Sequence, residues 1–195
     1  MIDPLGMEIK IFDYPSSVAE GEGDTLERSW EGGETVSRDS YTVPTPTKAD
    51  GGYSIALSGE LKINIIYRSG IDRILRGGRS NLTLHDHEFA HAKDAAEKWN
   101  MFAEVANRYE KTWPSKSCAI LAGNLVTALH NKAVADMGFI GADFDLVEYG
   151  EKSSDPVVRR DVKKAWDDAL KAQEDAERDL KLREKDFNDW NCKCP

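Results

Sequence analysis

The sequence predicts an α+β fold in which a small β-sheet is followed by a helix with an H-E-x-x-H motif, a second core helix and a long charged C-terminal helix. Three observations predict it. Short stretches of alternating polar and apolar residues, typical of half-buried strands, lie before residue 68. Apolar residues spaced three or four apart then run through 82–106, and a stretch rich in Ala, Leu and Val follows at 117–137. Residues 154–190 are dense in both charges and carry only a sparse apolar seam.

The strongest strand predictions are residues 53–57 and 61–67. The second stretch, Leu-Lys-Ile-Asn-Ile-Ile-Tyr, alternates and is rich in isoleucine, which favours β structure. The Ser-Gly-Glu sequence between the two stretches predicts a tight hairpin. Residues 8–13 also alternate, and 25–30 is expected to pair with 35–43 inside a segment rich in Gly, Ser, Thr and Pro.

The first helix is expected to pack one face on the core, and the second helix is expected to be buried. Ser80 or Asn81 is a candidate N-cap for the first helix, which is either continuous or broken near Asn100. Gly138 is expected to end the second helix, because glycine is frequent just past helix C-termini. The stretch 139–150 would then be a loop that follows a buried helix.

The third helix is expected to begin at Ser154-Asp155-Pro156, which offers a capping side chain and a proline at an early helical position. Its sparse seam indicates a surface helix with one packed side. Self-association of two copies through this C-terminal helix, as a coiled coil, is the alternative. The chain thus divides into an N-terminal irregular β region (1–52), a core (53–150) and a C-terminal long helix with a Cys-x-Cys tail (151–195).

The charge balance bounds the partners of the chain. It has 35 acidic and 26 basic residues and a formal net charge of −9, which argues against nucleic acid and against an anionic membrane surface. The sequence contains no run of about 18 apolar residues, so no transmembrane helix is predicted. The first residues lack the basic flank and the apolar run of a signal peptide, so the compartment stays unknown and export of a mature form stays open.

The three cysteines are Cys118 and the tail pair Cys192 and Cys194. Three cysteines are too few for a disulfide framework. A soft-metal clamp in the tail, a disulfide between the tail and Cys118, and plain free thiols all remain open.

The most specific motif is His87-Glu88-Phe89-Ala90-His91, an H-E-x-x-H pattern. Residues four apart project to the same face of a helix, so His87 and His91 can share one metal ion. Imidazole nitrogens favour Zn²⁺, which keeps an open position for water in catalytic sites. Glu88 is then the candidate general base, able to take a proton from a water that the metal activates. The two histidines point away from the apolar stripe, whereas His85 falls on the core side and is interpreted as structural.

The motif leaves the third metal ligand open. Asp94 lies about 10 Å along the helix axis from His87, too far to share one ion with it. If the first helix breaks near Asn100, Glu104 or Glu110 on a returning helix is a candidate third ligand, and Asp145 in the predicted loop is another. Tyr149 in the same loop is the candidate oxyanion stabiliser. Loops that follow buried helices are frequent positions for such groups.

An H-E-x-x-H helix preceded by strand-forming residues resembles the zincin class of metallopeptidases. In those enzymes an edge strand beside the site helix holds the substrate in extended form, and residues 61–67 would take that part here. The resemblance implies a zinc-dependent metallopeptidase that hydrolyses peptide or protein substrates with Glu88 as general base. The alternative is a catalytically degenerate zincin-like binding or interaction protein.

More narrowly, residues 53–150 are similar to the domain-of-unknown-function 922 family, a bacterial group thought to contain zinc proteases. The shared order is a strand, the H-E-x-x-H helix, a helix with a cysteine and a loop that begins with an aromatic residue and Asp. That family has Thr and His in the loop where this chain has Val147 and Tyr149. If that histidine is a metal ligand, the resemblance implies that Asp145 or Glu148 serves in its place.

Overall fold

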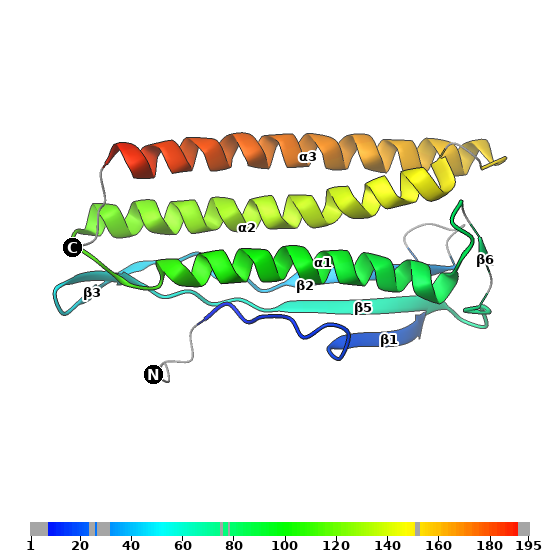
Figure 1. Ribbon diagram of the computed structural model, residues 1–195, viewed down its shortest axis with the longest axis horizontal. Coiled ribbons are helices and arrows are strands. Elements are labelled where there is room, and N and C mark those ends of the chain that lie inside the picture. Colours follow the sequence, from blue (N-terminus) through cyan, green and yellow to red (C-terminus); the bar gives the residue numbers. More distant parts are fainter. Residues whose placement is uncertain are drawn as a thin grey trace.

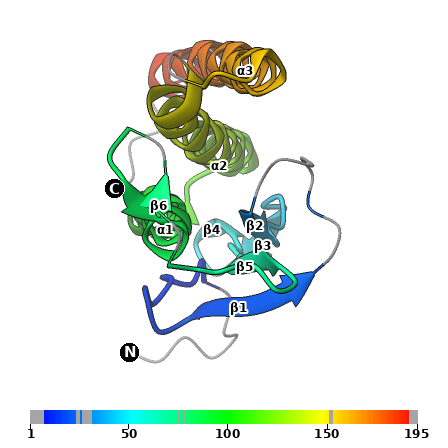
Figure 2. The ribbon, with the colours of Figure 1, turned by 90° about the vertical axis from the view of Figure 1, so that its right-hand side faces the viewer.

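The structure is a computed structural model of the 195-residue chain, and it describes residues 8–23, 26, 32–74, 76–77, 79–150 and 153–190. Within these residues, three long helices lie side by side above an array of strands (Figure 1). They are α1 (Leu84–Ala106), α2 (Lys116–Asp145) and α3 (Pro156–Asp189). Seen end-on, α1 lies against the strands, α2 packs on α1, and α3 is outermost (Figure 2). The predicted α+β fold is confirmed.

The main sheet has the order β1-β5-β2. β5 (Leu61–Arg68) is its central strand, parallel to β1 (Val18–Gly23) and antiparallel to β2 (Gly33–Asp39). The prediction that residues 61–67 form the edge strand beside the site helix is therefore wrong. The edge next to α1 belongs to β2, which comes from the N-terminal region of the chain.

The predicted hairpin between 53–57 and 61–67 is also wrong. β4 (Gly52–Ile55) pairs with β3 (Pro46–Ala49) and β8 (Thr112–Trp113), in a different sheet from β5. The chain does not turn back at Gly59, because Ser58 and Gly59 form isolated bridges with Thr42 and Ile9. These bridges keep the connection extended. The short strands β6 (Arg76–Gly77) and β7 (Leu82–Thr83) pair with each other just before α1.

Residues 8–13 are not a strand, although their alternation correctly identifies Ile9 and Phe12 as buried. Apart from the single bridge between Ile9 and Gly59, the backbone of this segment bonds to side chains of α1 and its C-cap. The N–H of Ile9 donates to Oδ1 of Asn107 (3.1 Å), and the N–H of Phe12 donates to Oδ1 of Asn100 (2.7 Å). Of the expected strand at 25–30, all but residue 26 lies outside the described residues.

Two helix ends differ from the prediction. Thr83, rather than Ser80 or Asn81, caps α1 by accepting the N–H of Asp86 (3.0 Å), and α1 is continuous. α2 passes through Gly138 to Asp145 and continues as a π-helical turn, Leu146–Gly150. A glycine ends a helix when it adopts a left-handed conformation, and Gly138 keeps a negative φ. Residues 139–150 are therefore helical and not a loop.

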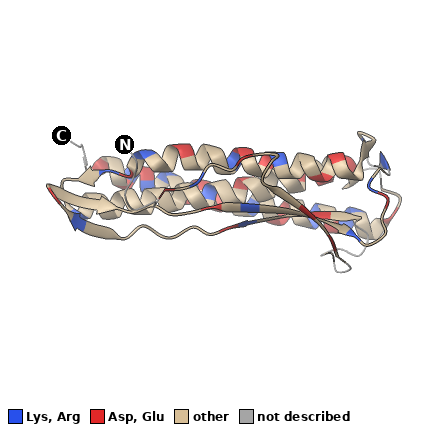
Figure 3. Ribbon diagram, turned by 90° about the horizontal axis from the view of Figure 1, so that it is seen from below, with Lys and Arg blue, Asp and Glu red and all other residues tan. Residues whose placement is uncertain are grey.

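α3 begins as predicted, since the side chain of Asp155 accepts the N–H of Val157 and Pro156 occupies the first turn. Val162 is its one fully buried residue, and its packed side lies along α2 within the same chain. Figure 3 shows acidic and basic residues interspersed along the helices. Within the described ranges, none of the helices combines the length and apolar character that a bilayer span requires.

Cys118, in the first turn of α2, is disulfide-bonded. This excludes the interpretation of Cys118 as a free thiol. The other two cysteines of the chain, Cys192 and Cys194, lie outside the described residues, and so does the predicted soft-metal clamp.

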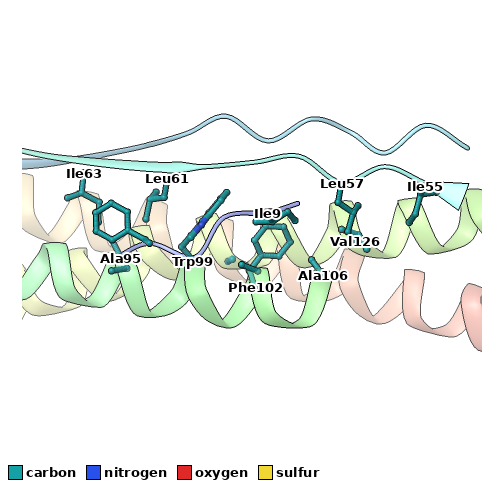
Figure 4. Close-up of a cluster of buried hydrophobic side chains, with 14 of the residues drawn as sticks. Ile9, Ile55, Leu57, Leu61, Ile63, Ala95, Trp99, Phe102, Ala106 and Val126 are labelled. Atoms are coloured by element: carbon teal, nitrogen blue, oxygen red, sulfur yellow. The ribbon is translucent and has the colours of Figure 1, made fainter. Parts of the chain in front are cut away.

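The core lies between the strands and α1, with Trp99 near its centre (Figure 4). The Trp99 side chain is fully buried, and its indole N–H donates to the carbonyl of Lys10 (2.8 Å). Its ring packs edge-on against Phe102, with centroids 5.4 Å apart. Trp99 therefore connects the N-terminal segment to the buried face of α1.

We expect Trp99→Ala to lower the free energy of unfolding by about 3–5 kcal/mol, because a large buried ring is replaced by a cavity. Urea unfolding followed by circular dichroism measures the change. The control is Trp190→Ala, since Trp190 is 63% exposed, and its effect should stay within about 0.5 kcal/mol. Equal effects of the two substitutions would contradict the assignment of the core.

Candidate metal centre

His87, His91 and Asp145 meet at one point between the first turns of α1 and the last turn of α2. Nε2 of His87 and Nε2 of His91 are 3.1 Å apart. Oδ1 of Asp145 lies 3.2 Å from the first nitrogen and 3.1 Å from the second. Within the described part of the chain, this is the one group of three or more His, Cys, Asp or Glu side chains whose ligand atoms converge in this way.

The triangle of ligand atoms fits a zinc ion. Tetrahedral Zn²⁺ with ligands at about 2.0–2.1 Å requires ligand atoms about 3.3 Å from one another. The three measured separations, 3.1 to 3.2 Å, are close to that value. Three protein ligands leave a fourth position of the tetrahedron open, which is typical of catalytic rather than structural zinc sites.

Asp145 reaches the histidines because α2 extends past Gly138. Gly141, one turn before Asp145, lies against His91: a Cβ on Gly141 would come within 3.3 Å of Nδ1 of that ring. Phe144 packs against both imidazoles, with its ring centroid 4.9 Å from that of His87 and 5.2 Å from that of His91. A small residue and an aromatic residue on α2 thus set the position of the histidine rings.

The local charges favour an ionised Asp145. Burial alone would raise its pKa, but the contacts with the imidazoles of His87 and His91 outweigh burial and hold the pKa of Asp145 well below its ordinary value. For His91 the signs are reversed: burial alone would lower its pKa, but the contact with the Asp145 carboxylate outweighs burial and raises the pKa of His91. A deprotonated carboxylate is the form that binds a metal ion.

Glu88 is buried beside this triangle, with 4% of its surface exposed. Its Oε2 accepts a hydrogen bond from the hydroxyl of Thr35 on β2 (2.8 Å). Gly33, on the same strand, leaves room for it, since a Cβ there would lie 3.1 Å from Cγ of Glu88. Burial raises the pKa of Glu88, and the Thr35 hydroxyl opposes that effect.

A groove of about 720 Å³ runs from this centre along β2, under α2 and α3. One wall is β2 with the residue before it, and it contributes Gly32, Gly33, Glu34, Thr35, Ser37 and Asp39. The opposite wall consists of small or apolar residues of α2 and α3. They are Val134, Met137, Gly138, Gly141, Ala142, Val158, Ala165 and Ala169. The groove can therefore receive an extended chain with apolar side chains.

Of the remaining candidate residues, only Tyr149 lies at the centre. Its ring centroid is 5.3 Å from that of His87, and it lines the groove. The choice of Glu110 as a ligand is wrong. It is exposed after the far end of α1, more than about 20 Å along the helix from His91. Glu148 is buried but faces away from the metal centre, because its Oε2 accepts the N–H (2.8 Å) and the hydroxyl (2.9 Å) of Ser80.

The other two histidines are not part of the centre. The side chain of His85 is 43% exposed and stacks on Phe89. It is not part of the ligand triangle, and the prediction that it lies on the core side of the helix is wrong. His130 lies in the middle of α2, with Nε2 2.8 Å from Oδ2 of Asp39 and its ring stacked on Tyr41.

Sequence reasoning missed Thr35 and Gly33. A threonine two residues after a glycine indicates at most a strand, because threonine favours β structure. Their role depends on β2 lying next to α1, which the sequence does not indicate.

The chain was compared with protein-family models, with curated proteins and with solved structures, and none of the three comparisons found a match.

Proposed function

We propose that this protein is a zinc-dependent peptidase in which His87, His91 and Asp145 hold the ion and Glu88 is the general base. The observation that carries the proposal is the convergence of two imidazole nitrogens and a carboxylate oxygen to within 3.2 Å of one another, beside a buried glutamate. The three converging side chains and Glu88 all line one groove.

When bound, a zinc ion supplies a Lewis acid that polarises a peptide carbonyl and acidifies a water molecule. The carboxylate of Glu88 accepts a proton at Oε1 or Oε2 and returns it to the leaving amine. Burial suits Glu88 to this role, because a raised pKa brings a carboxylate nearer to the pH at which it exchanges protons. Tyr149, beside His87 in the groove wall, is the candidate donor to the carbonyl oxygen as charge develops on it.

The free edge of β2 supports a peptide as substrate. Among the described residues no strand pairs with this edge. The N–H of Arg68 in β5 donates to the carbonyl of Gly32, and the N–H of Ser40 donates to the carbonyl of Glu60, just before β5. The backbone N–H and C=O groups of the even-numbered residues of β2 therefore point toward β5, and those of the odd-numbered residues point away from it. All four odd-numbered residues of β2 line the groove, together with the even-numbered Gly32 and Glu34. A peptide in extended form can add to this edge by main-chain hydrogen bonds.

The alternative, a degenerate zincin-like binding protein, rested on the lack of an obvious third ligand. Asp145 is a candidate for that ligand, because its Oδ1 lies within 3.2 Å of Nε2 of His87 and of Nε2 of His91. This reduces the support for the alternative. No other observation in the described residues favours the alternative over the peptidase.

Metal removal tests the proposal. The purified protein should hold one zinc per chain, measured by X-ray fluorescence, and should cleave members of a mixed peptide library, measured by mass spectrometry. We expect a chelator to abolish cleavage, and one equivalent of Zn²⁺ to restore it, because the ion supplies the Lewis acid. A protein that retains no zinc, or cleavage that is unchanged without metal, would contradict the proposal.

A further inference from the structure

The hydrogen bond between Thr35 and Glu88 joins the edge strand to the proposed general base. We propose that Thr35 is a positioning residue, which holds the Glu88 carboxylate at the metal centre and connects it to the strand that receives the peptide. This inference rests on the proposed function for its catalytic consequence. The contact on which it stands can be tested separately.

The contact is specific to one hydroxyl. Oγ1 of Thr35 lies 2.8 Å from Oε2 of Glu88 and 2.9 Å from the main-chain oxygen of Glu88. A hydroxyl has one proton to donate, and the carboxylate is the stronger acceptor. Within the described residues, Thr35 is the only hydrogen-bond partner of the Glu88 side chain. Without that hydroxyl, the carboxylate would be buried and held by packing alone.

Gly33 restricts the carboxylate from the same face of β2. A Cβ at residue 33 would lie 3.1 Å from Cγ, 3.2 Å from Oε1 and 3.3 Å from Cδ of Glu88. The side chain of Glu88 therefore lies directly on the backbone of Gly33, with the Thr35 hydroxyl two residues further along the strand. The glycine permits the close approach, and the threonine fixes the orientation of the carboxylate.

The backbone of Thr35 faces the other way from β5. Because it is an odd-numbered residue of β2, its N–H and C=O point to the free edge, where a peptide would add. One residue thus offers its main chain to the peptide and its side chain to the base. General-base catalysis requires the base within hydrogen-bond reach of the proton, and small displacements reduce it strongly.

Thr35→Val tests the proposal, because valine keeps the shape of threonine and removes the hydroxyl. In the zinc-loaded protein we expect kcat for peptide cleavage to fall about 10- to 100-fold, with KM within about twofold and one zinc still bound. Thr35→Ser should restore kcat to within about threefold, since it returns the hydroxyl. Thr47→Val is the matched control. Thr47 is on β3, exposed and bonded to Ser54, and its loss should leave kcat unchanged.

A double-mutant cycle tests the contact without any activity. Urea unfolding midpoints of the metal-free protein are compared for Thr35→Val, Glu88→Ala and the double variant. We expect Thr35→Val to lower the midpoint when the Glu88 side chain is present, and to lower it less when that side chain is absent and the hydroxyl can donate only to the main-chain oxygen of residue 88. Additive midpoints, or a kcat of Thr35→Val equal to that of the wild type, would overturn the proposal. If the zinc-loaded wild type cleaves no peptide, the peptidase proposal fails, and the cycle alone decides whether Thr35 holds Glu88.

Discussion

Glu88→Gln is expected to lower kcat for peptide hydrolysis by about 100- to 10,000-fold, the contribution usual for a general base. Glutamine keeps the size of the side chain and can accept the hydrogen bond from Thr35, but it cannot take up a proton. Zinc content, measured by X-ray fluorescence, should remain at one ion per chain, because Glu88 is not one of the three converging residues.

The matched control for Glu88→Gln is Glu97→Gln. Glu97 is on the same helix, with its side chain 61% exposed and 3.8 Å from Nζ of Lys93. Its loss should leave kcat and zinc content unchanged. A Glu88→Gln variant that hydrolyses peptides within about threefold of the wild-type rate would assign the base to another group.

Asp145→Ala is expected to weaken zinc binding by more than about 100-fold. This is a larger effect than the loss of a residue that only hydrogen-bonds to a metal ligand, which costs about 10- to 100-fold. The substitution removes the only carboxylate oxygen of the ligand triangle and leaves two imidazoles, which is one ligand fewer than catalytic zinc sites use. Competition with a chromophoric chelator measures the affinity.

Glu110→Ala separates two of the candidate ligands that the sequence offered. Because Glu110 is exposed beyond the far end of α1, its removal should leave the zinc affinity unchanged. The reverse result, with zinc lost in Glu110→Ala and kept in Asp145→Ala, would contradict the metal centre described here.

The local part of the site could be predicted from the sequence. His87, Glu88 and His91 lie within one turn and a half of a single helix, so helical periodicity alone brings the two histidines to one face. Asp145 and Tyr149 were among the candidates, but the sequence did not distinguish Asp145 from Glu110. That choice depends on how α2 returns along α1, which periodicity does not determine.

Two errors have a common physical origin. Gly138 was expected to end a helix, and Gly59 was expected to allow a hairpin. Both residues permit a turn without requiring one. At Gly138 the packing of α2 on α1 and α3 favours a continued helix, and at Gly59 the bridge to Ile9 keeps the chain extended. Tertiary contacts outweighed local preference in both cases.

The assignment of the edge strand failed for a related reason. The alternation in β5 correctly predicted which of its residues are buried, since Ile63, Ile65 and Tyr67 are all at 1% exposure or less. Alternation does not indicate which strands lie on either side. β1 and β2 flank β5 across long sequence separations, so the edge position could be found only in the assembled sheet.

The unpaired side of β2 also bears on how copies of this chain behave at high concentration. An exposed strand edge can pair with a strand of another chain, and such pairing leads to aggregation. β2 carries charges at Glu34, Arg38 and Asp39, and α2 and α3 overhang the groove beside it. Charged edge residues and an overhanging element are both means by which proteins hinder such joining. These features are expected to hinder the pairing of β2 with the β2 strand of a second copy.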